Sequence, residues 1–350
     1  MGANSKIEWT GRTWNPLAGC EWASEGCDNC YAARDAVGRL SSHELYAGLA
    51  VRTPDGGARF TGEIRTAPER LDQPCRWTKP SLVFVNSMSD LFHPGVPTEF
   101  IANVFAVMAL TPRHTYQVLT KRPQRMAALT NDPEFVTLVH DLARVNATAR
   151  RRHSGAVTLP GSTLDGDLWP LPNVWLGTSI EEDRYVFRAN ALRAAEAAVR
   201  FISAEPLLGP LPSLDLTGID WVIVGGESGP NARPMHPDWA RDLRDRCAPC
   251  PDCWGDGVIG VERPHSGGDV AEVPVQCRCL GDRPGVAFLF KQWGEWSPNH
   301  YLASGERVML GAGMIGRDPT VMVRVGKAAA GRMLDGRTWD EYPPAKAVSA

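Results

Sequence analysis

The sequence predicts a mixed α/β protein, a partial or complete TIM-like βα barrel that carries an inserted small zinc-binding module. Short apolar runs alternate with stretches of helical periodicity, the runs end in polar residues or glycine, and most cysteines fall into two groups. Strands that alternate with helices form right-handed βαβ units and a parallel sheet. Six or more such units can close into a barrel.

Composition narrows the class of protein. The 350 residues are 43% hydrophobic and 22% charged with a formal net charge of -3, which suits a globular protein without the basic excess of many nucleic-acid binders. Residues 1–9 lack an apolar signal core, and no uninterrupted apolar run reaches about 18 residues, so we expect a cytoplasmic protein without a membrane partner. In that compartment the nine cysteines are better explained as metal ligands than as disulfides.

The first cysteine group lies near the N-terminus. Cys20, Cys27 and Cys30 follow the spacing C-x6-C-x2-C in a loop rich in Gly, Ser and Asn. A structural zinc site closes its tetrahedron with four protein ligands, whereas a site that does chemistry keeps a position open. Three thiols therefore indicate an open metal site, unless Cys75 or His43 supplies a fourth ligand and makes it a closed zinc site.

The predicted helices and strands follow this loop in alternation. Helical spacing predicts helices at 31–48, 100–110 and 183–198. The apolar or β-branched runs predict six strands, at 81–88, 115–120, 173–179, 199–205, 221–227 and 286–292. Their nearly continuous apolar character is typical of parallel strands buried on both faces.

Each predicted strand ends in a functional group. These groups are Asp90, Lys121, Ser179, Glu205, Glu227 and Lys291. The carboxyl ends of the strands form the active-site rim of a βα barrel. Lysines there can neutralise a carboxylate or phosphate, and the acids can bind hydroxyls, an ammonium or base edges; the same residues can equally form ion pairs across the barrel mouth. We take Lys121, Glu205 and Lys291 as candidate catalytic residues, and Asp90, Ser179 and Glu227 as candidate cofactor-binding residues.

The second cysteine group interrupts the alternation just before the last strand. Cys250 and Cys253 form a C-x2-C pair, and Cys277 and Cys279 form a tighter C-x-C pair, with Cys247 as a competing ligand. Four thiolates at this spacing predict a structural Zn²⁺. The chain then divides into a barrel with the cysteine loop (1–246), a zinc-ribbon-like module (247–283), and the last barrel strand with a C-terminal extension (284–350).

Several segments together resemble a known family. They are residues 14–16, 30–32, 86–92, 119–123, 175–179, 203–209, 224–229, 290–294 and 323–332. They are similar to an uncharacterised phage-type three-cysteine-motif family, sometimes encoded beside a three-Cys-motif partner protein, which looks like a divergent radical S-adenosylmethionine enzyme. The resemblance implies a TIM-like barrel of the radical S-adenosylmethionine type, with a 4Fe-4S cluster on the first three cysteines and S-adenosylmethionine as cosubstrate.

The sequence departs from the pattern of such enzymes in three places. The first gap between cysteines is six residues where three are usual, and Asn29 stands where an aromatic often precedes the last cysteine. Gly225, Gly226 and Glu227 look like the glycine-rich segment that meets the methionine amino group, but that specific role is not transferred to them; both glycines are kept as candidate cofactor-binding residues. The segment lies on a late strand rather than the second one.

The sequence thus favours an enzyme that starts radical chemistry on an unknown substrate, with a nucleotide or nucleic-acid base as the expected class. An electron donor, nucleic acid and a three-Cys-motif partner protein are its candidate partners. One alternative is a non-catalytic, metal-stapled nucleic-acid-binding protein of phage origin. Another is zinc-assisted hydrolysis, although hydrolytic zinc sites usually carry His and carboxylate ligands.

Overall fold

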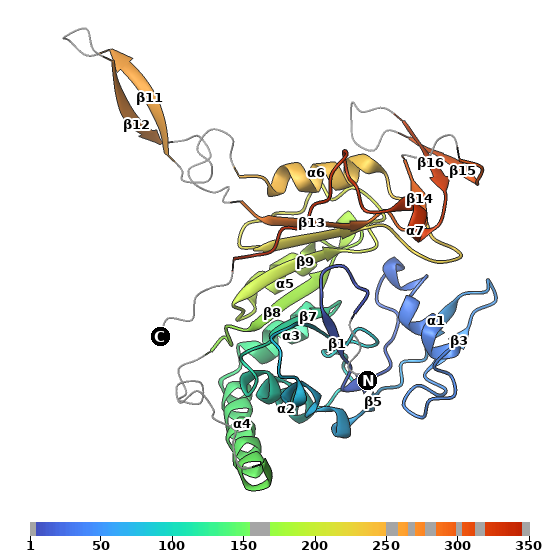
Figure 1. Cartoon of the computed structure of the whole chain (residues 1–350), viewed down its shortest axis with the longest axis vertical. Helices are drawn as coiled ribbons and strands as arrows, with labels where there is room; N and C mark the ends of the chain where they lie inside the picture. The colour runs from blue at the N-terminus through green and yellow to red at the C-terminus, as the bar shows by residue number, and fades with distance from the viewer. Residues whose placement is uncertain are drawn as a thin grey trace.

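A computed structural model describes residues 5–154, 169–249, 258–264, 270–276, 285–298, 303–311 and 319–344. Its centre is a curled, seven-stranded sheet in which every pairing is parallel (Figure 1). The strands follow one another in chain order: β1 (Arg12–Trp14), β6 (Leu82–Val85), β7 (Thr115–Thr120), β8 (Val174–Ser179), β9 (Val199–Ala204), β10 (Trp221–Gly225) and β13 (Ala287–Gln292). Among the described residues β1 and β13 do not pair, so the barrel is partial.

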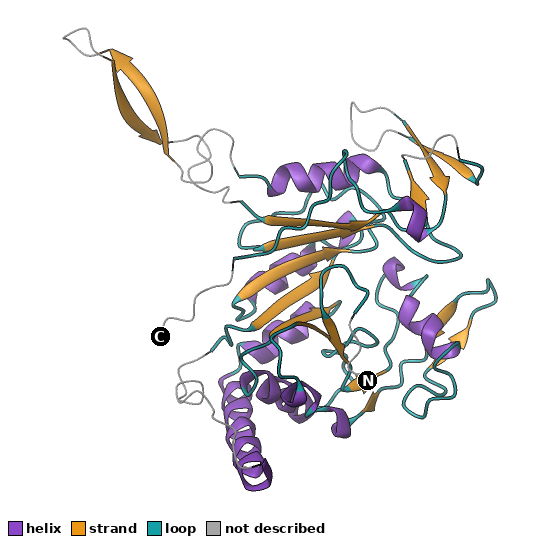
Figure 2. Cartoon of the chain, viewed as in Figure 1, coloured by secondary structure: helices purple, strands orange, loops and turns teal. Residues whose placement is uncertain are grey.

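Helices cover one face of this sheet (Figure 2). They are α2 (Thr98–Ala109), α3 (Pro123–Thr130), α4 (Pro133–Ser154), α5 (Phe187–Ala194) and α6 (Pro237–Cys247). Alternate strand residues face them: Val83 and Val85 pack into the cluster that the helices share, whereas Phe84 joins the opposite cluster. That opposite cluster is largely aromatic, with Trp9, Phe84, Trp175, Phe201 and Trp221. Both faces are therefore buried, which explains the continuous apolar runs.

The six predicted strands are confirmed within a few residues, and the helix prediction at 100–110 corresponds to α2. The helix expected at 31–48 is wrong in length: α1 (Tyr31–Val37) ends at Gly38, and turns follow. The stretch at 183–198 begins as a 3-10 turn, η4 (Asp183–Tyr185), before α5 starts. β1 was not predicted, because three residues are too few to show a period.

The chain between β1 and β6 forms a small cap beside the sheet. It contains β2 (Leu17–Ala18), η1 (Glu25–Cys27), α1, β3 (Ala50–Arg52), β4 (Ala58–Phe60), β5 (Arg65–Thr66), η2 (Pro68–Arg70) and η3 (Gln73–Arg76). Its own apolar cluster includes Ala33, Tyr46 and Leu49, and Cys20 and Cys30 pack against that cluster partly buried. The cap thereby holds two of the three cysteines against a core that the barrel does not provide.

The predicted zinc module is described only as a hairpin. β11 (Val258–Pro264) and β12 (Val270–Gln276) pair antiparallel and stand away from the sheet (Figure 1). Cys250, Cys253, Cys277 and Cys279 lie outside the described residues, so the zinc site and the domain boundaries at 247 and 283 stay predictions.

The C-terminal region adds a second small sheet and then returns to the barrel. β14 (Trp296–Ser297), β16 (Thr320–Arg324) and β15 (Arg307–Leu310) pair antiparallel in that order, and α7 (Lys327–Ala330) follows. Phe290 N donates to Trp339 O at 3.0 Å and Glu341 N to Phe288 O at 3.2 Å. The segment 339–341 therefore lies along the outer edge of β13. In the described part of the chain, no helix is both long and apolar enough to cross a membrane.

Candidate functional site

A cavity of about 460 Å³ lies at the carboxyl ends of the strands. Cys20, Cys27 and Cys30 border it, and so do all the predicted rim residues: Asp90, Lys121, Ser179, Glu205, Gly226, Glu227 and Lys291. Of the predicted site residues in the described part of the barrel, Gly225 does not line this cavity. Its size falls in the range usual for small-molecule sites. The expectation that parallel strand ends meet at one edge therefore holds for this chain.

The loop that carries the three cysteines follows β1 directly. Gly19 has a φ of +94°, and a Cβ there would lie 2.0 Å from the backbone oxygen of Glu63, so the position before Cys20 admits only glycine without rearrangement. Cys27 ends the 3-10 turn η1, and Cys30 is the N-cap of α1. The loop is thus bounded by a tight turn and a helix start.

The three thiols have no fourth Cys or His ligand beside them in the cavity, among the described residues. In the described part of the chain, no three His, Cys, Asp or Glu side chains are arranged to hold a single metal ion. Neither Cys75 nor His43, the alternative fourth ligands, lines the cavity, and His43 instead faces Arg70 at 3.2 Å. In a cubane each thiolate binds a different iron, so its ligands stand further apart than those of one ion. Over the described ranges of the chain, the three thiols border one cavity, and no fourth Cys and no His lines it.

The protonation of the thiols is set by their surroundings. Burial, reinforced by the charge of Asp90, raises the pKa of Cys20 to about 12, and burial also raises the pKa of Cys30. Without a metal both groups are therefore neutral thiols at pH 7. Because thiolates are the ligating form, metal binding here releases protons.

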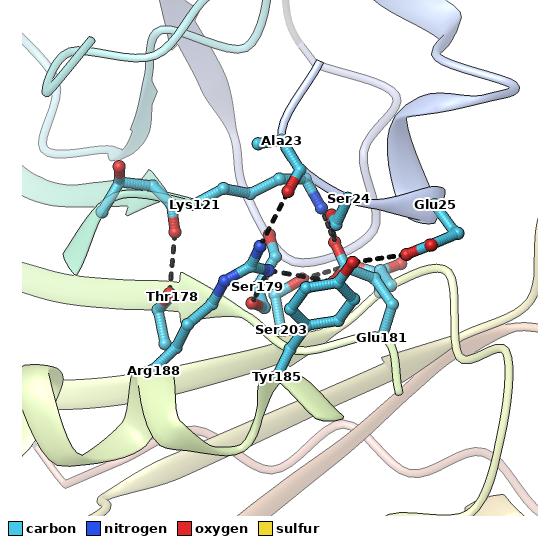
Figure 3. A network of polar contacts seen from close by, with 12 residues as sticks. Ala23, Ser24, Glu25, Lys121, Thr178, Ser179, Glu181, Tyr185, Arg188 and Ser203 are labelled. Atoms are coloured by element: carbon cyan, nitrogen blue, oxygen red, sulfur yellow. Dashed lines mark hydrogen bonds and ion pairs between the residues drawn. The ribbon is translucent and has the colours of Figure 1, made fainter. Parts of the chain in front are cut away.

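Lys121 belongs to a buried ion-pair network that crosses from the barrel to the cysteine loop (Figure 3). Its partner Glu181 is fully buried, accepts hydrogen bonds from Ser24 Oγ at 3.0 Å and Arg188 Nη1 at 3.0 Å, and also contacts Lys121 Nζ. Burial lowers the pKa of Lys121 to about 8. The same Arg188 donates to the backbone oxygen of Ser179 at 2.9 Å. This network ties residues 23–25 to the end of β8.

The carboxylate of Asp90 is occupied by hydrogen bonds from other residues of the protein. It accepts hydrogen bonds from Thr120 Oγ1 at 2.7 Å, Arg122 Nη1 at 2.8 Å, and the backbone N–H groups of Phe92 and Lys121 at 3.0 and 3.1 Å. These four bonds are the usual capacity of a carboxylate. Asp90 therefore joins the ends of β6 and β7 and has little capacity left for a ligand.

Glu205 and Lys291 form an ion pair in the cavity wall. Lys291 Nζ lies 2.9 Å from Glu205 Oε1, while Glu205 Oε2 accepts from Trp9 Nε1 and Ser203 Oγ, each at 3.3 Å. The side chain of Lys291 is 18% exposed, and that of Glu205 is 13% exposed. Of the three acidic candidates, Glu205 has the most exposed side chain, since Asp90 and Glu227 are 7% and 4% exposed.

Gly225, the last residue of β10, and Gly226, which follows it, have a packing role. A Cβ on Gly225 would lie 2.5 Å from Glu205 Oε1, and one on Gly226 would lie 1.9 Å from the backbone oxygen of Trp293. Glycine at both positions lets β10 approach its neighbours closely.

Four residues that hold the cysteine loop in place were not predicted from the sequence. Glu181 lies two positions beyond the end of β8, so the rule that strand ends carry function could have included it. Arg188 and Arg233 lie outside the strand ends and carry no local signal. Asn29 stood out only as a departure from the expected aromatic, and its carboxamide donates to Glu227 Oε2 at 2.9 Å.

Comparison with known proteins gives a family but no activity. A family model described as "Protein of unknown function (DUF5131)" matches residues 4–251 and 264–343. No curated protein matches. Among solved structures, "Spore photoproduct lyase complexed with dinucleoside spore photoproduct" aligns over 78% of this chain and 71% of that chain, with a TM-score of 0.33 and 10% identity. A likeness this slight supports no further inference. The match to the family model covers most of the chain, which therefore belongs to the DUF5131 family of proteins of unknown function.

Proposed function

We propose that this protein is a radical S-adenosylmethionine-type enzyme that holds a 4Fe-4S cluster on Cys20, Cys27 and Cys30. The observation that carries the proposal is the position of these thiols: the loop after the first strand brings all three to one cavity with the charged strand ends. When bound, the cluster and S-adenosylmethionine supply a carbon radical that abstracts hydrogen from an unactivated position. A nucleotide or nucleic-acid base is the proposed substrate class, and a separate protein would supply the electron.

The chain's own residues would bind and orient the reactants. Lys121 is a buried cation beside the cysteines, where it offsets the negative charge of a thiolate-bound cluster. The ion pair of Glu205 and Lys291 offers an acceptor and a donor to the cavity, suited to a hydroxyl and to a carboxylate or phosphate respectively. The aromatic side chains of Trp9 and Phe84 line the same cavity and exclude water from it.

The deciding experiment is anaerobic reconstitution with iron and sulfide, followed by metal analysis and electron paramagnetic resonance of the reduced protein. The proposal predicts about four irons per chain and a cubane signal whose g values shift when S-adenosylmethionine is added. Cys27→Ala should abolish the signal, because the remaining two thiols cannot hold three corners.

Cys75→Ala provides the matched control, since this thiol lies outside the cavity. It should assemble the cluster as the wild type does. Protein that takes up two zinc ions and no iron would instead support the metal-stapled binding protein, and the proposal would be abandoned. One zinc ion beside a full cluster would support the predicted site on Cys250, Cys253, Cys277 and Cys279.

A further inference from the structure

We infer that Asn29, Glu227 and Arg233 form a latch that fixes the cysteine loop in the geometry in which its thiols bind metal, with Arg233 as a positioning residue. This inference rests on the proposed function, because the latch holds the loop to which the cluster is assigned. It gives Glu227 a role different from the cofactor binding that the sequence predicts.

The carboxylate of Glu227 is the centre of the latch. Its Oε2 accepts hydrogen bonds from Asn29 Nδ2 at 2.9 Å and from Arg233 N and Nε at 2.8 and 2.9 Å, and its Oε1 accepts from Arg233 Nη2 at 2.6 Å. Only 5% of Glu227 is exposed. Four accepted bonds are the usual capacity of a carboxylate, so Glu227 has little left to offer a ligand even though it borders the cavity.

Arg233 extends from this carboxylate to the loop itself. Its Nη2 donates to the backbone oxygen of Glu25 at 2.8 Å, and its Nη1 lies 3.3 Å from Asp28 Oδ2. Asn29 Nδ2 also donates to the backbone oxygen of Asn231 at 2.9 Å. The latch therefore grips the loop at positions 25, 28 and 29, on both sides of Cys27 and immediately before Cys30.

The loop needs such support because its own structure is weak. The turn η1 is three residues long, and its N-cap Ser24 makes no side-chain capping bond. A single 3-10 turn forms too few internal hydrogen bonds to persist alone. The Glu181 network holds the loop at Ser24, whereas the latch provides the side-chain contacts of Asp28 and Asn29 with the segment after β10. The latch also explains why asparagine stands at position 29: its carboxamide donates to Glu227, whereas a phenylalanine ring could not.

The test compares Arg233→Lys and Glu227→Gln with wild type in two measurements. The first is hydrogen exchange of residues 24–34 in the metal-free full-length protein. A lysine cannot reach Glu25, Asp28 and Glu227 together, so exchange in Arg233→Lys should be faster by about tenfold or more. Glu227→Gln keeps one acceptor oxygen and should give an intermediate value.

The second measurement is the rate at which a ferrous chelator removes iron from the reconstituted protein, together with its paramagnetic resonance spectrum. Loss of a residue that orients metal ligands typically weakens metal binding about 10- to 100-fold, and iron loss should accelerate accordingly in Arg233→Lys. The g values of the reduced cluster should also change. If Arg233 only stabilised the fold as a whole, Arg233→Lys would leave the g values unchanged. It would then also speed hydrogen exchange throughout the protein rather than in residues 24–34 alone.

Arg241→Lys is the matched control. Arg241 forms a similar fork, with Nε and Nη2 lying 3.0 and 2.7 Å from Asp335 Oδ1, on residues that do not line the cavity. It should leave the exchange of residues 24–34 and the iron kinetics unchanged. The inference is wrong if Arg233→Lys behaves like wild type in the exchange experiment. If wild type binds no iron, the proposed function fails, and the exchange data still decide whether the latch holds the loop.

Discussion

At the scale of single residues, most carboxylates at the rim of the barrel are already occupied by hydrogen bonds from the protein itself. Asp90 and Glu227 each accept four hydrogen bonds from the protein, whereas Glu205 shares its carboxylate with Lys291 in the open cavity wall. A carboxylate at a strand end can therefore either hold two segments of the protein together or bind a ligand. The number of hydrogen bonds that it already accepts from the protein distinguishes these two roles.

Gly226 provides a test of packing at this scale. A Cβ there would overlap the backbone oxygen of Trp293, which cannot move aside as a side chain could. Gly226→Ala should therefore lower the free energy of unfolding by about 1–3 kcal/mol, measured by urea denaturation. Gly209→Ala is the control: a Cβ at Gly209 has no neighbour within 4 Å, and its change should stay within about 0.5 kcal/mol. Equal effects in the two variants would contradict the packing argument.

A second test concerns His140 on α4. Its ring is 5% exposed, and neither ring nitrogen has a hydrogen-bond partner among the described residues. Each such buried polar atom costs roughly 1–3 kcal/mol, so His140→Phe should raise the free energy of unfolding by about 1 kcal/mol or more at pH 8.

The same substitution should change the pH dependence of stability. Burial, reinforced by Arg144 and opposed by Asp141, lowers the pKa of His140 below its ordinary 6.5. The unfolded chain then binds this proton more readily, so the wild type loses stability as the pH falls below about 6.5. The advantage of His140→Phe should be larger at pH 5.5 than at pH 8 in urea denaturation. An advantage that does not change with pH would count against the shifted pKa.

At the scale of elements, the cysteine loop is held from two directions. The segment after β8 contacts it through Glu181 and Arg188 (Figure 3). The segment after β10 contacts it through Glu227 and Arg233. A loop with little structure of its own is thus given a fixed shape by charged groups from strands far away in the sequence. Such buried charges are costly unless fully paired, which ties the shape of the loop to the integrity of the barrel edge.

At the scale of the whole molecule, the half-barrel leaves β13 as a terminal strand, and the C-terminal segment covers its outer edge. Backbone bonds from Phe290 to Trp339 and from Glu341 to Phe288 satisfy the edge, and Trp221 Nε1 donates to the backbone oxygen of Glu341 at 2.9 Å. An uncovered edge strand is a template for pairing with another chain.

Truncation after Gly331 tests this role. It removes these three hydrogen bonds and also those from Phe288 N to Glu341, from Trp293 Nε1 to Met333 and from Arg241 to Asp335, so it should lower the free energy of unfolding by at least about 3 kcal/mol. It should also produce oligomers in sedimentation velocity, because the freed edge can pair between copies. Truncation after Pro344 keeps these contacts and serves as the control. A monomeric truncation after Gly331 with wild-type stability would show that the segment does not protect the edge.

Much of the architecture follows from the sequence alone. Six of the seven strands, their order and the edge at which their ends meet are predictable, because apolar runs and their spacing reflect local periodicity and the handedness of βαβ units. The three cysteines and nearly all the rim residues were predicted to share a site for the same reason, and they line one cavity.

Only the tertiary structure decided which partners each rim residue has. Glu227 and Arg233 are six positions apart and form a bidentate pair, yet no period in the sequence predicts that this pair reaches back to Asn29 and Glu25. Glu181 lies just beyond the end of β8, but only the structure shows that it is fully buried with Arg188, Ser24 and Lys121 as its partners. Sequence patterns record which residues are buried and where strands end. The partners of a buried charge depend on contacts between distant segments, which local patterns do not record.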